Sequence, residues 1–372
     1  MRRALATAAL GALVAACSSS SGPKPAELPR IEQSATVRAL WTARVGDGER
    51  FVFMPALAEG AVFTAARDGT VMRLAMASGR TVWSVSAGPR LSAGAGANGE
   101  IVAVASEEGE VIALDAKTGA RRWTARVSSE VIAAPTVGAG LVLVRSIDNR
   151  LFAFEAQDGK RRWVYQRAPS ALIIRAPAGV AIQDDSAFAG FAGGKLVALA
   201  LANGGVRWEA TVALPKGGTE LERVTDVVGD PAVQGREVCA ATYQGRVGCY
   251  EVATGRQVWA RDISSLTGVS LDPRYAFVAD DKGAVQAFDR TNGRSVWKQD
   301  KLANRQLSLP QPVGELVAVG DLEGYVHFLA RDTGAFVARY ATGGGPVSAP
   351  PEALPRGVLV QTQSGTVSAL AL

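Results

Sequence analysis

The chain has 372 residues, of which 48% are hydrophobic and 20% are charged, so it is long and apolar enough to bury a sizeable core. It contains 41 Gly and 17 Pro but one His and three Cys, which leaves few candidates for zinc ligands, imidazole catalysis or a disulfide scaffold. The formal net charge of +5 is small for a nucleic-acid-binding domain, so we expect no nucleic-acid partner.

The first residues have the pattern of a secretory signal. Arg2 and Arg3 precede an uncharged run over residues 4–16, which is too short to span a bilayer. Small residues stand directly before Cys17, in an arrangement that resembles a bacterial lipobox. That resemblance implies cleavage before Cys17, acylation of this residue, and export to the outer membrane because Ser18 and not Asp follows it.

We therefore expect three segments. Residues 1–16 are predicted to be a lipoprotein signal peptide, and residues 17–34 an acylated flexible tether, because residues 18–29 read SSSSGPKPAELP. The mature chain is expected to be lipid-anchored in the outer membrane and to face the periplasm. Residues 35–372 form the folded domain.

This domain is a repeat array, visible when DGTVMRLAMASGRTVW at 68–83 is aligned with EGEVIALDAKTGARRW at 108–123. Further copies follow to the end of the chain, the last of them a half copy. The turn position recurs at Gly69, Gly109, Asn149, Gly194, Gly245, Gly283, Gly324 and Gly365, at intervals of 40, 40, 45, 51, 38, 41 and 41 residues. The array therefore contains eight copies.

Each copy has the pattern of one propeller blade. An apolar run such as residues 101–105 meets a turn and returns as residues 111–114, and a second turn, TG or NG, leads to a strand that ends in Trp. Four strands in about 42 residues are typical of a blade. The sequence therefore predicts an all-β fold, an eight-bladed β-propeller of four-stranded antiparallel blades.

Six of the seven Trp residues close a repeat, whereas Trp41 precedes the first complete one. Because the final copy lacks its last strand, we expect the segment around Trp41 to pair beside Leu370 and close the ring, which removes an open sheet edge. We interpret the Trp set as packing between blades, with each indole N–H bonded to a neighbour.

Cys239 and Cys249 flank the turn TYQGR in the fifth copy. A three-residue loop with Gly245 in the left-handed conformation places Thr242 opposite Arg246 and Cys239 opposite Cys249. A two-residue loop would instead put the thiols on opposite faces of the sheet. We expect the first arrangement and a structural disulfide, formed in an oxidising periplasm.

The unit ALDAKTGARRW at 113–123 resembles the tryptophan-docking repeat of pyrroloquinoline-quinone dehydrogenases, a likeness that indicates fold and not function. Three segments are more specific: LIIRAP at 172–177, GGTELERVTDV at 217–227 and EGYVHFL at 323–329. With these, the chain resembles the BamB family, lipoproteins of the outer-membrane β-barrel assembly machinery. That resemblance implies a scaffold without enzymatic activity or cofactor that binds the POTRA domains of BamA, with nascent outer-membrane proteins as further candidate partners.

The resemblance also implies a contact site. The family's Leu-x-Leu-Arg stretch and acidic position fall on Leu172, Ile174, Arg175 and Asp226. A second acidic residue, expected two positions after Asp226, is Val228 here, which leaves Asp230 as a substitute. Blade geometry points to the same surface, because the two longest intervals arise from consecutive connections on one face, where extra loop length commonly carries binding.

The alternative function is that of a periplasmic quinone-dependent dehydrogenase. Those enzymes resemble this chain in repeat type, but they are typically longer and carry a disulfide between adjacent cysteines and a calcium site beside a catalytic Asp. This sequence has no adjacent Cys pair. We expect His327 to be a packed strand residue and the paired acids at 184–185 and 280–281 to be solvated turns, so no catalytic or metal site is predicted.

Overall fold

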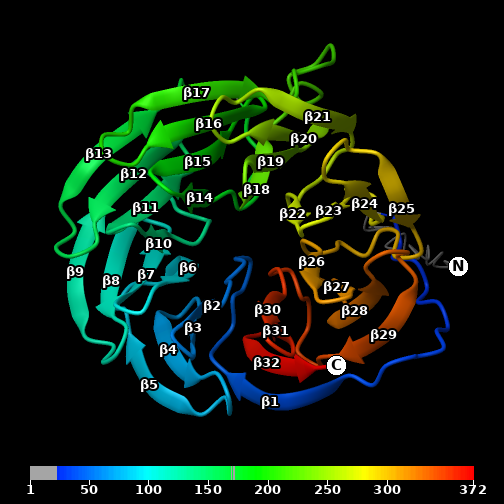
Figure 1. Ribbon diagram of the computed structural model, residues 1–372. Helices are drawn as coiled ribbons and strands as arrows, with labels where there is room; N and C mark the ends of the chain where they lie inside the picture. The colour runs from blue at the N-terminus through cyan, green and yellow to red at the C-terminus, as the bar shows by residue number, and fades with distance from the viewer. Residues whose placement is uncertain (1–22, 169, 171) are drawn as a thin grey trace, which may run out of the picture.

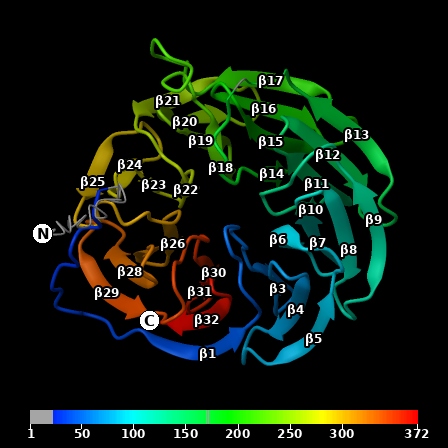
Figure 2. The same cartoon turned by 180° about the vertical axis from the view of Figure 1, so that it is seen from behind.

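The computed structural model describes residues 23–168, 170 and 172–372. Over these residues the chain forms 32 strands in eight four-stranded sheets, which are arranged as a ring (Figures 1 and 2). Every neighbouring pair of strands is antiparallel, as in the hairpin patterns of the sequence. The predicted eight-bladed β-propeller is therefore confirmed. The described part of the chain contains no helix long and apolar enough to cross a membrane.

Each blade runs from an innermost strand to an outermost strand. Blades 1 to 4 are built from β2 (Ala56–Ala58), β3 (Ala61–Ala65), β4 (Thr70–Ala75) and β5 (Thr81–Ser86); β6 (Leu91–Ala97), β7 (Ile101–Ser106), β8 (Glu110–Asp115) and β9 (Arg121–Arg126); β10 (Thr136–Gly138), β11 (Leu141–Ser146), β12 (Arg150–Glu155) and β13 (Arg161–Gln166); and β14 (Val180–Gln183), β15 (Ser186–Phe191), β16 (Lys195–Ala200) and β17 (Val206–Thr211).

Blades 5 to 8 complete the ring. They are built from β18 (Val227–Gln234), β19 (Glu237–Thr242), β20 (Arg246–Glu251) and β21 (Gln257–Asp262); β22 (Ser270–Leu271), β23 (Tyr275–Ala279), β24 (Val285–Asp289) and β25 (Ser295–Gln299); β26 (Gln311–Val313), β27 (Leu316–Gly320), β28 (Tyr325–Ala330) and β29 (Phe336–Ala341); and β30 (Glu352–Leu354), β31 (Gly357–Gln361), β32 (Thr366–Ala371) and β1 (Arg38–Arg44).

The last blade combines both ends of the chain. β1 pairs with β32, so that Ala39 lies opposite Leu370 and Trp41 lies opposite Ala369. Figure 1 shows the blue first strand lying outside the red last one. This pairing supplies the fourth strand that the final half copy lacks.

The antiparallel order divides the loops between two faces of the ring. The connections between blades and the turns between the second and third strands lie on one face, which we call the connection face. The turns between the third and fourth strands lie on the other face, which we call the TG face after the TG dipeptide that several of these turns carry. Every residue of the candidate site described below belongs to the connection face.

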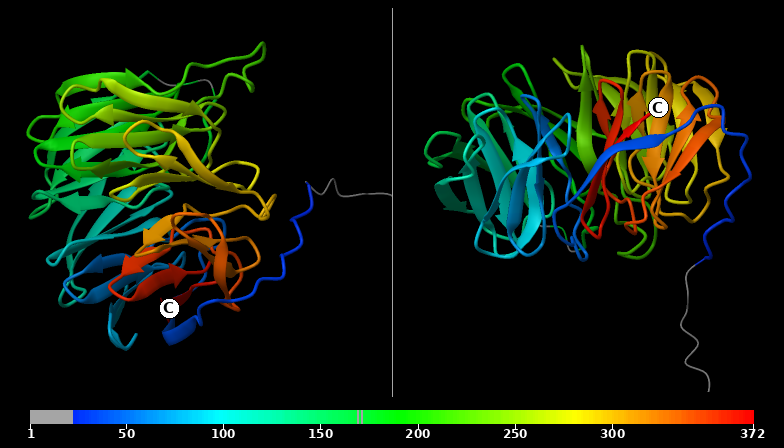
Figure 3. Two further views of the ribbon diagram at one scale, coloured as in Figure 1. Left: turned by 45° about the vertical axis from the view of Figure 1, so that its right-hand side comes forward. Right: turned by 90° about the horizontal axis from the view of Figure 1, so that it is seen from below.

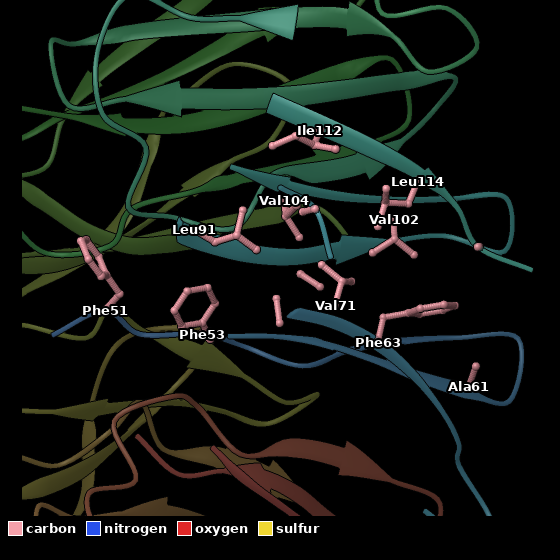
Figure 4. Close-up of a cluster of buried hydrophobic side chains, with 14 residues drawn as sticks. Phe51, Phe53, Ala61, Phe63, Val71, Leu91, Val102, Val104, Ile112 and Leu114 are labelled. Atoms are coloured by element: carbon pink, nitrogen blue, oxygen red, sulfur yellow. The ribbon is translucent and has the colours of Figure 1, made fainter. Parts of the chain in front are cut away.

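The core lies between successive blades, because both sides of each sheet are apolar. Figure 4 shows the cluster between blades 1 and 2, in which Phe63 and Val71 of the first blade face Val102, Val104 and Ile112 of the second. All these side chains are buried.

The tryptophans join seven of the eight blades to the next one, as predicted. Each indole N–H donates to a backbone carbonyl of the following blade: Trp41 to Met76, Trp83 to Ala116, Trp123 to Ala156, Trp163 to Leu201, Trp208 to Val252, Trp259 to Arg290 and Trp297 to Arg331. The indole ring covers the Gly of the turn between the third and fourth strands of that blade, where a Cβ would lie only 2.4–3.0 Å from the ring. The Trp and the Gly of neighbouring repeats therefore form one contact.

Cys239 lies opposite Cys249 in the β19–β20 pair, so the predicted register is confirmed. The two sulfurs are bonded in the structure, and the Cα atoms are 4.0 Å apart. The conformation predicted for the turn is wrong, because Gln244, with φ of 48°, takes the left-handed position that we assigned to Gly245. Gly245 is needed for space: a Cβ there would come within 2.3 Å of the Thr242 hydroxyl.

Candidate functional site

Two long connections stand next to each other on the connection face. Residues 167–179 join β13 to β14, and residues 212–226 join β17 to β18. They account for the two longest intervals in the repeat array. The second connection projects from the ring, as the green segment at the upper right of the left-hand view in Figure 3 shows.

Asp226 holds the first connection in place. Its carboxylate accepts hydrogen bonds from the backbone N–H of Ile174 at 2.8 Å and from that of Gly193 at 3.3 Å. The Asp226 residue is only 6% exposed. Burial raises the pKa of Asp226, while the two N–H donors and nearby Arg145 oppose that rise. The carboxylate therefore points into the protein, beneath the connection that it supports.

Arg145, near the end of β11, supplies the positive charge below this carboxylate. Burial lowers the pKa of Arg145 to about 10, and the charges of Asp226 and Asp230 act in the opposite direction. The guanidinium donates to the Ala178 carbonyl at 3.2 Å and lies over the ring of Phe191. The positive charge of Arg145 thus interacts with the carboxylates of Asp226 and Asp230, and its guanidinium also holds the end of the first connection through Ala178.

Asp230, in the irregular part of β18 that follows the second connection, repeats the role of Asp226. Its carboxylate accepts a hydrogen bond from the N–H of Gly179 at 2.7 Å, and the N–H of Gly229 donates to the Pro177 carbonyl at 2.9 Å. Val228 between them is buried. Residues 174–179 are therefore bonded to residues 226–230 at three points, two of them through carboxylates.

Arg175 is presented outward from the connection that these bonds fix. Its guanidinium forms a two-pronged ion pair with Glu130 of the β9–β10 connection, at 2.7 and 2.8 Å. The Arg175 side chain is 51% exposed and that of Glu130 13%. This pairing raises the pKa of Arg175 and holds the planar group in one orientation. Arg50, Glu107, Glu130 and Arg175 line an open polar hollow of about 400 Å³.

Apolar side chains stand beside this polar hollow. Leu172 is 46% exposed, and Leu214 and Leu221 on the second connection are 67% and 70% exposed. The two connections enclose a shallow groove of about 170 Å³, whose lining includes Leu172, Pro215 and Val224. Exposed leucines on a fixed backbone are typical of a surface that anchors another protein.

The structure thus brings together the four site residues expected from the sequence, but in two roles. Leu172 and Arg175 are exposed, Ile174 is half-buried and donates through its backbone, and Asp226 lies below them. Cys17 lies outside the described residues.

Two residues of the site, Arg145 and Glu130, were not predicted from the sequence. Arg145 interrupts the apolar strand LVLVRS, which was a usable signal, since a charge in a buried strand requires a partner. Glu130 carries no such signal, because it lies in a polar connection of a different repeat. The described residues include no group of three His, Cys, Asp or Glu side chains placed to hold a metal ion.

The sequence matches one protein-family model and relatives of known name. Residues 67–299 match the family model described as outer membrane protein assembly factor BamB. The chain belongs to the BamB family. The protein of that name from Bordetella pertussis is 46% identical over 345 residues, which cover 92% of this chain and 89% of the relative. The one from Burkholderia pseudomallei is 40% identical over 366 residues, which cover 98% and 96%.

Solved structures agree with this family. The crystal structure of BamB from Moraxella catarrhalis superposes with a TM-score of 0.83 at 25% identity, covering 91% of this chain and 100% of that chain. A quinohemoprotein alcohol dehydrogenase from Pseudomonas putida superposes with a TM-score of 0.70 at 14% identity, covering 90% of this chain and 76% of that chain. At that identity the likeness shows the fold alone. The BamB name places the chain with the outer-membrane protein assembly factors.

Proposed function

We propose that this chain is a non-catalytic scaffold lipoprotein of the outer-membrane β-barrel assembly complex, which binds the POTRA domains of BamA and assists insertion of outer-membrane proteins. The observation that carries the proposal is the connection at residues 172–177, which is fixed from below by Asp226 and exposes Leu172 and Arg175. Membership of the BamB family supports the assembly role.

In this proposal Leu172 and Arg175 contribute to binding in different ways. Leu172 supplies apolar area beside the groove, and Arg175 supplies a planar cation that can share or exchange its carboxylate partner. Because Glu130 already orients the guanidinium, little side-chain freedom is lost on binding. Asp226 contributes by holding the Ile174 backbone, so its role in binding is indirect.

A titration with purified BamA POTRA domains tests the contact. Arg175→Glu places a like charge beside Glu130 and removes the donor, so we expect affinity to fall about tenfold or more without a loss of thermal stability. Arg162→Glu is the matched control, because Arg162 forms a similar two-pronged pair with Glu155 elsewhere in blade 3. Equal binding by wild type and Arg175→Glu would contradict the proposed surface.

Cell fractionation tests the lipid anchor. If Cys17 is the acylated residue, Cys17→Ser releases the folded propeller from membranes, whereas wild type stays bound in high salt and incorporates labelled fatty acid. An unlabelled wild-type chain, or a Cys17→Ser chain that stays on the membrane, would contradict the lipoprotein assignment.

The competing dehydrogenase function has a direct test. Purified protein mixed with calcium and pyrroloquinoline quinone is expected to show neither cofactor absorbance nor dye reduction. Either signal would favour an enzyme.

A further inference from the structure

The segment that follows the expected acylation site lies against the ring. Residues 24–34 run along the outer side of blade 7, as Figure 3 shows for the blue segment beside the orange strands. Contacts begin on the connection face, where the Asn304 side chain donates to the Lys24 carbonyl at 3.2 Å. They continue along β29, where the N–H of Ser34 donates to the Val337 carbonyl at 3.0 Å.

The middle of this segment fits a receptor on the β25–β26 connection. The N–H of Ala26 donates to the Ala303 carbonyl at 2.9 Å, and the guanidinium of Arg305 donates back to the Ala26 carbonyl at 2.9 Å. Leu28 packs against the apolar cluster that contains Leu302 and Leu307. Both the backbone and the apolar side chain of the segment are therefore recognised.

Arg305 is prepared for this contact by the ring itself. Its side chain is 2% exposed and forms an ion pair with Asp321 at 2.7 Å and another with Glu323. These pairs raise the pKa of Arg305 against the opposing effect of burial. A buried guanidinium that aims a free donor at a chain carbonyl is costly to leave unpaired, so the segment satisfies it.

A second guanidinium, that of Arg339, binds another backbone carbonyl of the segment. Arg339 donates through Nη1 to the Pro29 carbonyl at 3.2 Å and through Nε to Nδ1 of His327 at 3.1 Å. His327 is buried, and its Nε2 is 2.9 Å from the Asp321 carboxylate. His327, the only His of the chain, thus connects Arg339 with Arg305, because Asp321 also bonds to Arg305.

We infer that residues 24–34 form a strap, bound by Arg305 and Arg339, which fixes the point where the anchored chain leaves the ring. That point is the rim of the connection face beside blade 7. Blade 7 is four blades away from blade 3 in the ring of eight, so the exit lies opposite the surface that carries Leu172 and Arg175. The two sites share a face but occupy its opposite sides.

The strap also limits the reach of the anchor, a consequence that rests on the proposed acylation of Cys17. Five residues separate Cys17 from Pro23, so the two residues are six steps apart along the chain and at most about 20 Å apart in space. The rim beside blade 7 is then held near the membrane, and the surface with Arg175 lies about one ring width away from it. A free tether up to residue 34 would reach almost three times as far, about 60 Å.

Trypsin digestion of the full-length chain, purified in detergent, tests the strap. Cleavage after Arg30 requires the neighbouring residues to leave the ring, because a protease must bind an extended segment. We expect Leu28→Asp, which puts a charge against Leu302 and Leu307, to speed cleavage at Arg30 about tenfold. Glu27→Gln is the matched control, because Glu27 is exposed and its change is expected to leave the rate unaltered.

The N-terminal fragment is followed by mass, so the result does not depend on whether Cys17 is acylated. Amide hydrogen exchange supplies a second measurement, in which the N–H groups of Ala26 and Ser34 are expected to exchange slowly. Equal cleavage of wild type and Leu28→Asp, or exchange of both amides at the rate of an unstructured peptide, would overturn the strap. Failure of BamA binding would leave both results unchanged.

Discussion

The carboxylate of Asp226 accepts a hydrogen bond from the backbone N–H of Ile174, 52 residues earlier in the chain, at 2.8 Å. A second bond, from the N–H of Gly193, ties the same carboxylate to the β15–β16 turn. One buried side chain therefore fixes the connection that presents Leu172 and Arg175. In the proposed function, Asp226 therefore acts on binding through the backbone that it holds, without reaching the surface.

Variants of Asp226 distinguish an indirect role in binding, through the backbone that Asp226 holds, from direct contact with BamA. Asp226→Ala leaves two N–H donors unsatisfied and removes one of the two negative charges near Arg145, so we expect a loss of about 1–3 kcal/mol in the free energy of unfolding and much weaker BamA binding. Asp226→Asn keeps one acceptor oxygen and is expected to be intermediate. Amide exchange at Ile174 and Gly193 is expected to quicken in parallel. Lost binding with unchanged exchange at both amides would instead indicate direct contact.

The contact between Trp and Gly predicts a difference between two glycines of blade 7. Gly334 has φ of 70°, and a Cβ there would lie 2.5 Å from the Trp297 ring, whereas at Gly314, with φ of 59°, it would meet open space among the described residues. Gly314→Ala is expected to lower the free energy of unfolding by about 1–2 kcal/mol, because only the left-handed backbone conformation is unfavourable for Ala there. We expect Gly334→Ala to lose about 1–3 kcal/mol more in urea unfolding. Equal losses in the two variants would show that the Trp297 ring moves to make room for the added Cβ.

The pH dependence of stability includes opposing contributions from His327 and Glu352. Burial lowers the pKa of His327 below its ordinary 6.5, although the bond to Asp321 opposes this. The unfolded chain then binds a proton more readily, so the contribution of His327 to stability falls as the pH drops below 6.5. Burial, with Asp230 nearby, raises the pKa of Glu352 from 4.5 to about 7. Its contribution therefore rises as the pH drops from 7 toward 4.5.

Melting temperatures between pH 7.5 and 5 separate these contributions. Relative to wild type, His327→Gln removes the acid-induced loss, so its stability is expected to increase on acidification. Glu352→Gln lacks the gain in stability that Glu352 provides at low pH, so its stability is expected to decrease on acidification. Each effect is limited to about 1.4 kcal/mol per pH unit. Parallel curves for all three proteins would contradict the assigned shifts.

The repeat period was enough to predict the fold, because each blade reuses the same local signals. The Gly of the TG turn and the Trp of the last strand recur at fixed spacing, and neighbouring copies must bury the apolar faces that they share. The register at Cys239 and Cys249 followed from counting residues outward from a turn. Such contacts are local, so the sequence contains what is needed to infer them.

The site was less predictable, because its contacts cross repeats. Nothing near Asp226 in the sequence indicates that Ile174 will be its partner, and the burial of Asp226 depends on that contact. The composition of residues 18–29 predicts a tether, yet Arg305 and Arg339 bind its backbone carbonyls, a group that every residue carries. Patterns of side chains cannot reveal recognition of this kind.

The disulfide gives a test with a natural control inside the chain. In blade 2, Ala103 lies opposite Ala113, the pair equivalent to Cys239 and Cys249, so two alanines fit this position without rearrangement. We therefore expect the double variant Cys239→Ala/Cys249→Ala to fold and to lose about 2 kcal/mol in the free energy of unfolding, because a short loop is no longer closed in the unfolded chain. The intact mass of a Cys17→Ser chain, alkylated under denaturing conditions without reductant, measures the bond directly. We expect no alkylation before reduction and two additions after it. Two additions without reductant would show that these thiols remain free.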